Sequence, residues 1–305
     1  MSLEKYTLEK LLTFGSFGVI YLGRGEDGET VVIKVITLNN RSKEDARREA
    51  NILKGLSLST QKGAKYVVRY VDDFRVNMHE ELYHIIVMEN LSQWRTLDKY
   101  MSHIWKKCGI TVIEPNILKV IVYRLLNGLS YIHENKIIHK DIKPENIMID
   151  HMYNIKFIDF GFSSSKEEGY KGTPLYLPPE SLSDHKIYKY KYKECACTSC
   201  LEESLIRGYK HDVWSLGIVF YQLANLSRYP DNFPFIIPSS RDINTFKESI
   251  KLNSYVYPSD YKYENNTNDI DFNYLIKWML ASDPKSRPTT QELLTYVNAF
   301  VGKDS

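Results

Sequence analysis

Three oxygen-bearing side chains near the middle of the sequence have the types and order needed to handle a hydroxyl group and a divalent cation. Asp141 and Asn146 lie in one polar segment, and Asp159 follows an apolar run and starts the sequence Asp-Phe-Gly. A carboxylate can accept a proton from a hydroxyl, and carboxylate and amide oxygens are ligands for Mg²⁺. Transfer of a phosphoryl group from a nucleotide requires both tasks and little covalent chemistry from the protein. The three side chains are therefore of the right kind for phosphoryl transfer.

The segments around these residues match two motifs in the right order. Residues 138–146 read Ile-His-Lys-Asp-Ile-Lys-Pro-Glu-Asn, and residues 157–161 read Phe-Ile-Asp-Phe-Gly. They resemble the catalytic loop H-R-D-x-x-x-x-N and the D-F-G loop of eukaryotic-type protein kinases. The resemblance implies that Asp141 accepts or orients the proton of the substrate hydroxyl and that Lys143 contacts the transferring phosphate. It also implies a site for Mg²⁺, or alternatively Mn²⁺, formed by Asn146 and Asp159.

A glycine-containing segment near the start of the sequence could cradle phosphate groups. Gly15 and Gly18 lack a Cβ atom, so their backbone N–H groups can approach phosphate oxygens closely. The segment resembles the kinase glycine-rich loop G-x-G-x-x-G-x-V, with Thr13 in place of the first glycine and Ile20 in place of the valine that packs on the nucleotide base. Two glycines in a hairpin also fit an ordinary turn. The resemblance implies nucleotide contacts from Thr13, Phe14, Gly15, Ser16, Phe17, Gly18 and Ile20.

A lysine within an apolar segment is the next candidate. Lys34 lies in Val-Val-Ile-Lys-Val-Ile, which is typical of a β-strand. A charge on an edge strand would account for it. The segment also resembles the kinase motif V-A-I-K, whose lysine holds the α- and β-phosphates and pairs with a glutamate on the next helix. We expect this glutamate to be Glu49, because it lies in the middle of the predicted helix near the face of Leu53; Glu44 is the competing candidate.

The segment from Ile85 to Leu91 resembles the last strand of the small lobe of a kinase and the hinge that follows it. The resemblance implies that Met88 is the gatekeeper residue and that the backbone groups of Glu89 and Leu91 bind adenine. A buried strand that ends in polar residues would have the same local sequence. Two further positions correspond to nucleotide-contacting residues of the family, and these are Val32 and Met148.

Further matches indicate the class of acceptor. Lys143 and the sequence Gly-Thr-Pro-Leu-Tyr at residues 172–176 resemble serine/threonine kinases rather than tyrosine kinases. In the family, a threonine at the position of Thr173 bonds to the catalytic aspartate and lysine. The resemblance implies an ATP-dependent enzyme that phosphorylates Ser or Thr of a protein substrate. A pseudokinase that binds nucleotide and acts as a scaffold or regulator is the alternative.

Two matches in the second half of the sequence concern structure in the family. The resemblance implies that Glu180 pairs with Arg287 and that Asp212 anchors the catalytic loop. Small-molecule kinases share the nucleotide machinery but usually lack these elements. The two matches therefore favour a protein kinase over a small-molecule kinase.

The hydrophobic patterns and the resemblance together predict a two-lobed α+β protein kinase fold in a single domain over residues 1–305. Residues 1–90 form the small lobe, with an antiparallel β-sheet and one helix, and residues 91–305 form the larger, mainly helical lobe. The predicted strands and helix of the small lobe are 31–36, 66–74, 83–88 and 42–56. The predicted helices of the large lobe are 115–133, 212–226, 272–279 and 289–300. A ligand cleft is expected where the lobes join.

The composition excludes several classes of partner. The 40 basic and 38 acidic side chains give a formal charge of +2, which is too small a field to attract nucleic acid or an anionic membrane surface. Neither end of the sequence has a long apolar run of the kind that a signal peptide contains. We therefore expect no nucleic-acid partner and no membrane attachment. The expected compartment is the cytoplasm, with the nucleus as the alternative.

Lys140 stands where the family motif has arginine. In kinases that are switched on by phosphorylation of the activation loop, that arginine holds the phosphate with a bidentate fork, whereas lysine offers a point charge. We therefore expect activity to depend weakly on loop phosphorylation. The segment between Asp159 and Glu180 nevertheless contains four candidate hydroxyl groups, on Ser163, Ser164, Ser165 and Thr173.

Residues 184–208 are longer than the family usually has at this place, and we interpret them as an insertion. Tyrosine and lysine alternate at residues 187–193. This pattern would suit a strand with one aromatic and one basic face that docks a partner. A solvated surface hairpin would have the same sequence.

The insertion also holds three of the four cysteines. Cys195, Cys197 and Cys200 resemble part of a zinc site, to which His185 or His211 could add a fourth ligand. Three cysteines so close together cannot staple a chain of this length, and there is no second C-x-x-C cluster. Reduced thiols without metal are the default expectation.

Overall fold

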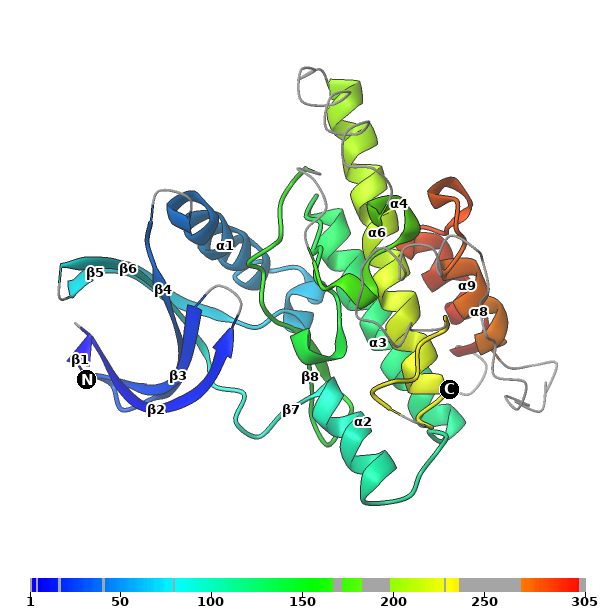
Figure 1. Cartoon of the computed structure of the whole chain (residues 1–305), viewed down its shortest axis with the longest axis horizontal. Helices are drawn as coiled ribbons and strands as arrows, with labels where there is room; N and C mark the ends of the chain where they lie inside the picture. The colour runs from blue at the N-terminus through cyan, green and yellow to red at the C-terminus, as the bar shows by residue number, and fades with distance from the viewer. Residues whose placement is uncertain are drawn as a thin grey trace.

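The computed structural model describes residues 2–3, 5–15, 18–39, 42–78, 80–166, 172–182, 198–227, 229–235 and 270–301. Within these residues the chain forms two lobes, with a curved sheet and helix α1 on one side and a bundle of helices on the other (Figure 1). This arrangement confirms the predicted α+β architecture.

The sheet of the small lobe contains six strands in the order β1-β2-β3-β4-β6-β5, and every neighbouring pair is antiparallel. Alternate side chains of the central strands point to opposite faces because a strand has a period of two residues. One face carries Ile33, Ile85 and Val87, which form a separate small core. The strands are β1 (Ser2–Leu3), β2 (Tyr6–Gly15), β3 (Gly18–Gly25), β4 (Thr30–Thr37), β5 (Tyr70–Met78) and β6 (Glu81–Glu89).

Helix α1 (Ser42–Ser57) covers the other face of this sheet. Its buried positions recur at helical spacing and include Ala46, Glu49, Ala50 and Leu53. The start of the helix is held by reciprocal hydrogen bonds with Asn39, because Asn39 N–H donates to Ser42 Oγ and Ser42 N–H donates to Asn39 Oδ1. Among the buried residues of the helix, Glu49 is the one that carries a carboxylate toward the sheet.

The predicted strand 66–74 is wrong at its beginning. Residues 62–66 form the 3-10 turn η1 (Lys62–Tyr66), and β5 starts only at Tyr70. Val67 is extended and forms a β-bridge with Phe157 of the large lobe, and Val68 N–H donates to Phe157 O at 3.0 Å. A partner that is distant in the sequence therefore takes these two valines away from the small sheet.

The large lobe begins with β7 (Arg95–Thr96), which pairs with β8 (Ile147–Ile149) and through it with β9 (Ile155–Phe157). Glu114 caps helix α3 by accepting hydrogen bonds from the N–H groups of Asn116 and Ile117, and Pro115 occupies the first helical position. The helices and 3-10 turns are α2 (Leu97–Lys106), α3 (Pro115–Glu134), η2 (Pro144–Asn146), η3 (Pro174–Tyr176), α4 (Pro179–Leu182), α6 (Thr198–Ala224), α8 (Phe272–Met279), η4 (Pro284–Ser286) and α9 (Thr290–Val301).

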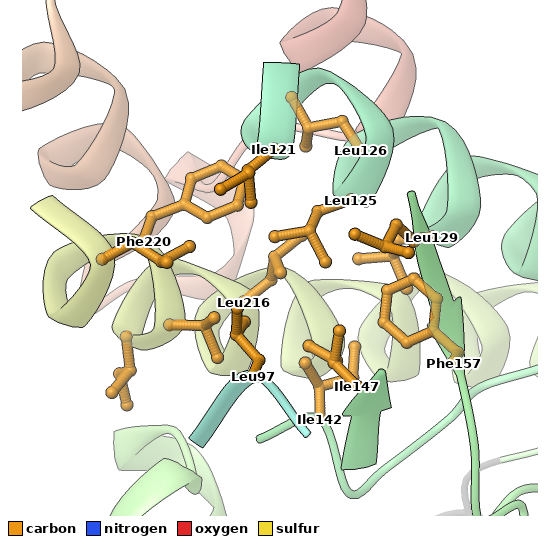
Figure 2. Packing of buried hydrophobic residues seen from close by; sticks show 14 of the residues in the cluster. Leu97, Ile121, Leu125, Leu126, Leu129, Ile142, Ile147, Phe157, Leu216 and Phe220 are labelled. Carbon is orange, nitrogen blue, oxygen red and sulfur yellow. The ribbon is translucent and has the colours of Figure 1, made fainter. Parts of the chain in front are cut away.

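The main core of the large lobe lies between α3 and α6. Figure 2 shows Ile121 and Leu125 of α3 beside Phe220 and Leu216 of α6, and Leu129 of α3 beside Phe157 of β9. Two apolar residues of the segment around Asp141 pack into the same core, Ile142 directly after Asp141 and Ile147 directly after Asn146. Because these anchors are fully buried, the polar residues beside them have a fixed position.

Helix α6 starts earlier than predicted. The expected helix 212–226 corresponds to the second half of α6, which ends at Ala224. The backbone is helical from Thr198, so residues 198–208 of the predicted insertion belong to this helix. Gly208 lies inside it, and a Cβ atom there would be only 2.1 Å from Ile138 Cδ1. The glycine is therefore required by close packing against Ile138 and does not end the helix.

Across the described ranges, no helix is both long enough and apolar enough to cross a bilayer.

Candidate functional site

Lys34 of β4 lies at the centre of the site and contacts two carboxylates. Its Nζ atom is 2.5 Å from Glu49 Oε1 on α1 and 2.8 Å from Asp159 Oδ1. Glu49 is buried on the sheet-facing side of α1, whereas the competing Glu44 is exposed. Burial alone would lower the pKa of Lys34, but the negative charges of Glu49 and Asp159 raise it above its ordinary value. The expected ion pair thus forms, and Lys34 is a charged cation with a fixed direction.

The carboxylate of Asp141 is surrounded by donors from three residues. Asp141 Oδ1 accepts hydrogen bonds from the N–H and Oγ1 of Thr173, at 3.0 and 2.7 Å. Asp141 Oδ2 accepts from Asn146 Nδ2 at 2.8 Å and lies 3.0 Å from Lys143 Nζ. Lys143 Nζ also donates to Thr173 Oγ1 at 2.7 Å, so the expected contacts of Thr173 with both residues are confirmed. These contacts fix the direction of the Asp141 side chain.

Asp212 of α6 holds the loop that carries Asp141. Its fully buried carboxylate accepts the backbone N–H groups of His139 and Lys140, each at 2.8 Å, and contacts His133 Nε2 at 3.0 Å. Burial alone would raise the pKa of Asp212, but the hydrogen bond and charge of His133 lower it below its usual value. The predicted anchor is therefore present as a charged carboxylate. It acts on a strained turn, since Lys140 has a φ of 68°.

Asp159 and Asn146 were the expected metal ligands, and their chemistry fits a hard divalent cation. Burial alone would raise the pKa of Asp159, but the positive charge of Lys34 holds it below its usual value, so the carboxylate is charged. Asn146 uses its Nδ2 group to donate to two atoms of Asp141, which leaves its amide oxygen for a cation. In the part of the chain that the structure describes, no cluster of three or more His, Cys, Asp or Glu side chains forms a metal site. A cation bound here would complete its shell with phosphate oxygens and water, as Mg²⁺ does.

Several expected nucleotide-binding residues lie on the same face of the small-lobe sheet as Lys34. Strand register places Thr13, Ile20 and Lys34 in one row across β2, β3 and β4, and it places Val32 beside Met88 in the next row. Positions two residues apart on a strand share a face. Ile20, Val32 and Met88 therefore lie on the same face as Lys34.

The loop between β2 and β3 is partly described. Gly15 and Gly18 pair at the end of this hairpin, and the Phe14 side chain is 74% exposed. Ser16 and Phe17 lie outside the described residues.

The expected hinge follows β6 directly. Glu89 N–H donates to Arg69 O at 2.9 Å, so this N–H group is already used within the protein. Leu91 is buried and its carbonyl accepts a hydrogen bond from Trp94 N–H. Met148 lies on β8, partly buried against the large core. The structure thus places Ile20, Val32, Met88 and Glu89 on strands of the small lobe, Leu91 shortly after β6, and Met148 in the large lobe.

The segment after Asp159 accepts hydrogen bonds from side chains elsewhere in the chain. Arg48 Nε of α1 donates to Ser163 O at 3.1 Å, and Lys140 Nζ donates to Lys166 O at 3.0 Å. Of the four hydroxyl groups expected in this segment, those of Ser163 and Ser164 are buried, that of Thr173 contacts Asp141, and Ser165 is exposed. Weak dependence on loop phosphorylation stays a prediction.

Gly172 allows the neighbouring Thr173 to reach Asp141. Its φ is 138°, and a Cβ atom at this position would lie 2.5 Å from the carbonyl oxygen of Lys140. Residues with a side chain rarely adopt such a conformation. The close approach of this segment to the catalytic loop therefore depends on glycine.

The expected pair of Glu180 and Arg287 is confirmed. Arg287 is buried, and its two terminal nitrogens lie 2.6 Å from the two carboxylate oxygens of Glu180. The guanidinium also lies over the ring of Trp214, 4.8 Å from its centroid. This bidentate geometry ties α4 to the segment before α9.

Two residues that contact the site were not expected from the sequence. Arg48 adjoins Glu49 on α1, and Lys156 of β9 forms a 2.5 Å ion pair with Glu89 in the hinge. The signal for Lys156 is weak, because a lysine between Ile155 and Phe157 also fits an ordinary alternating strand.

The zinc hypothesis lies mostly outside the described residues, which exclude Cys195, Cys197, His185 and the alternating segment 187–193. One version of it is wrong. Cys200 and His211 both lie in α6, where a helix rises about 1.5 Å per residue, so their backbones are roughly 16 Å apart. This separation is too large for both to bind one zinc ion.

Comparison with known proteins agrees with this geometry. A protein kinase domain model matches residues 6–297. The probable serine/threonine-protein kinase nek2 of Dictyostelium discoideum is 30% identical, over 96% of this chain and 62% of that protein. The serine/threonine-protein kinase Nek8 of Danio rerio is 29% identical, over 96% of this chain and 37% of that protein. This chain thus spans less than two thirds of either relative. With the domain match covering nearly all of its length, the chain belongs to the protein kinase domain family.

Proposed function

We propose that this chain is a serine/threonine protein kinase that transfers the γ-phosphate of ATP to a Ser or Thr hydroxyl of a protein substrate. The observation that carries the proposal is the donor set around Asp141, in which Lys143, Asn146 and Thr173 all contact one carboxylate. Lys34 is aligned at the same time by Glu49 and Asp159. Phosphoryl transfer depends on this kind of pre-positioned charge.

Each group has a distinct task in the proposed reaction. Asp141 orients the acceptor hydroxyl and accepts its proton, and Lys143 neutralises charge on the phosphoryl group as it moves. Lys34 holds the α- and β-phosphates. Asn146 and Asp159 would hold Mg²⁺, which neutralises phosphate charge when it is bound; Mn²⁺ is the alternative ion.

The adenine is proposed to bind between the lobes. Its base would lie under Ile20 and Val32 and over Met148, beside Met88 and the backbone groups of Glu89 and Leu91. The phosphates would run below the loop formed by Thr13, Phe14, Gly15, Ser16, Phe17 and Gly18. The rows of the sheet support this placement because they direct Ile20, Val32 and Met88 to the same face as Lys34.

The remaining properties of the protein are also proposals. We assign residues 1–305 to a single kinase domain that works in the cytoplasm, with the nucleus as the alternative. The small net charge supports the absence of a nucleic-acid partner. The segment 184–208 is a candidate docking site for a protein partner.

The test is transfer of radiolabelled γ-phosphate from ATP with Mg²⁺ to the protein itself and to a generic basic protein, followed by phosphoamino-acid analysis. We expect label on Ser or Thr, and we expect none with Asp159→Ala. A wild-type protein that binds ATP but labels nothing would favour the pseudokinase alternative. Label confined to Tyr would overturn the assignment of acceptor.

A further inference from the structure

Lys156 and Glu89 join the hinge to the large lobe through a side-chain contact outside the reacting groups. Lys156 Nζ lies 2.5 Å from Glu89 Oε1, and the same oxygen accepts the backbone N–H of Arg69 at 2.6 Å. The two charged side chains are only 15% and 19% exposed. Such a pair is screened less by solvent than a surface pair, so losing one partner leaves a partly buried charge without its counter-ion.

Backbone hydrogen bonds place this ion pair within a junction of three segments. Glu89 N–H donates to Arg69 O, and Val68 N–H donates to Phe157 O. Lys156 Nζ is also 3.5 Å from the carbonyl oxygen of Val67. The residues before β5, the hinge and strand β9 are therefore fixed to one another.

Strand β9 leads directly from this junction into the proposed metal site. Lys156 pairs with Met148 across β8 and β9, and Asp159 follows β9 after Ile158. A displacement of β9 would move Met148 and Asp159 together. Lys156 thus lies between Met148, which is proposed to contact adenine, and Asp159, which is proposed to bind the cation.

We propose that Lys156 is a positioning residue that couples adenine binding at the hinge to cation binding at Asp159. This inference rests on the proposed function, because it assigns adenine to the hinge and the cation to Asp159. Lys156 contacts neither the reacting atoms nor Asp159 itself. Its effect is to hold Glu89 and β9 in register, so that occupancy of one end of the nucleotide site improves the affinity of the other end.

The experiment measures ADP binding by calorimetry, with and without Mg²⁺, in the wild type, Lys156→Met, Glu89→Gln and the double variant. Lys156→Arg is the rescue variant because it keeps the cation. Arg24→Met is the matched control, because Arg24 forms a 2.7 Å pair with Glu9 on the surface of the small lobe, where side-chain exposures are 49% and 33%. The KM for ATP and the Mg²⁺ concentration for half-maximal phosphate transfer are measured in parallel.

We expect Mg²⁺ to improve ADP affinity in the wild type and this improvement to shrink at least about fivefold in Lys156→Met. Glu89→Gln and the double variant should match Lys156→Met rather than add to it, and Lys156→Arg and Arg24→Met should resemble the wild type. An unchanged Mg²⁺ effect in Lys156→Met, or additive losses in the double variant, would overturn the coupling.

The measurements of ADP binding test this inference separately from the proposed function. A wild type that binds ADP but transfers no phosphate would refute the kinase activity, and the Mg²⁺ effect on ADP binding would still decide the coupling. A wild type that does not bind ADP would refute both. If Lys156→Met fails to fold, Glu89→Gln and Lys156→Arg supply the same comparison.

Discussion

Replacing Asp212 by asparagine tests whether the catalytic loop is held in place by one buried carboxylate. The carboxylate accepts two backbone N–H groups at 2.8 Å and contacts His133. Asparagine has nearly the same shape, but its NH₂ group must face one of those two N–H donors. That donor then loses its acceptor in a buried place, which costs about 1–3 kcal/mol.

The remaining hydrogen bonds also weaken. Bonds to a charged acceptor contribute roughly 1 kcal/mol more than bonds to a neutral one. The free energy of unfolding of Asp212→Asn should therefore fall by about 2–4 kcal/mol. Because His139 and Lys140 directly precede Asp141, the loop should also shift, and phosphate transfer should slow at least about tenfold, with little change in the KM for ATP.

Asp150 offers a matched control. Its carboxylate also accepts two backbone N–H groups at 2.8 Å, from Met152 and Asn154, but in an exposed turn between β8 and β9. Water can replace a lost acceptor there, so Asp150→Asn should cost less than about 1 kcal/mol.

Urea denaturation and steady-state kinetics give the two readouts for both variants. Similar small losses in Asp212→Asn and Asp150→Asn, with transfer at the wild-type rate, would refute the idea that burial of this carboxylate fixes the loop.

Three further predictions follow from the site. Gly172→Ala should slow phosphate transfer at least about tenfold while ADP affinity changes little, because its Cβ atom would displace Thr173 from Asp141; equal rates in a transfer assay would contradict this. Arg287→Lys should lower the free energy of unfolding by about 1–3 kcal/mol, since lysine keeps the positive charge but cannot form the bidentate pair, and an unchanged free energy of unfolding in urea would count against it. Burial lowers the pKa values of His139 and His211, so both stay neutral in the folded protein while the unfolded chain binds protons below about pH 6.5. The contribution of the two neutral histidines to the free energy of unfolding is therefore present above that pH and is lost as the pH falls toward the lowered pKa values. The loss for the two groups together is up to about 2.7 kcal/mol per pH unit. A free energy of unfolding in urea that stays constant between about pH 6.5 and 5.5 would contradict this prediction.

Local patterns predicted the parts of the site that depend on local geometry. The helical phase of α1 distinguished Glu49 from Glu44, because only one of them lies on the buried face. The motif around Asp141 likewise placed several polar groups within one short loop. Helical spacing selected Glu49, whereas the resemblance to the kinase motifs indicated that Lys34 needs a glutamate and that Asp141 has polar partners.

Three features that depend on distant contacts, and that no family motif covers, were missed. Val67 and Val68 look like the start of a strand, but their partner is Phe157 in the other lobe. Gly208 looks like the end of a segment, although it lies inside α6 because Ile138 packs closely against it. Lys156 and Glu89 form an ion pair although they are 67 residues apart, and the sequence around neither residue indicates this contact. Tertiary packing decides each of these outcomes.

The most direct test of the proposed function separates nucleotide binding from phosphate transfer in Asp141→Asn. Rapid-quench measurement of γ-phosphate transfer from Mg²⁺-ATP to a basic protein would be paired with calorimetric binding of ADP. We expect transfer to fall at least about a hundredfold while ADP affinity stays within about threefold of the wild type, since Asp141 is proposed to act on the acceptor hydroxyl. Transfer by Asp141→Asn at the wild-type rate would contradict the proposed role of this carboxylate.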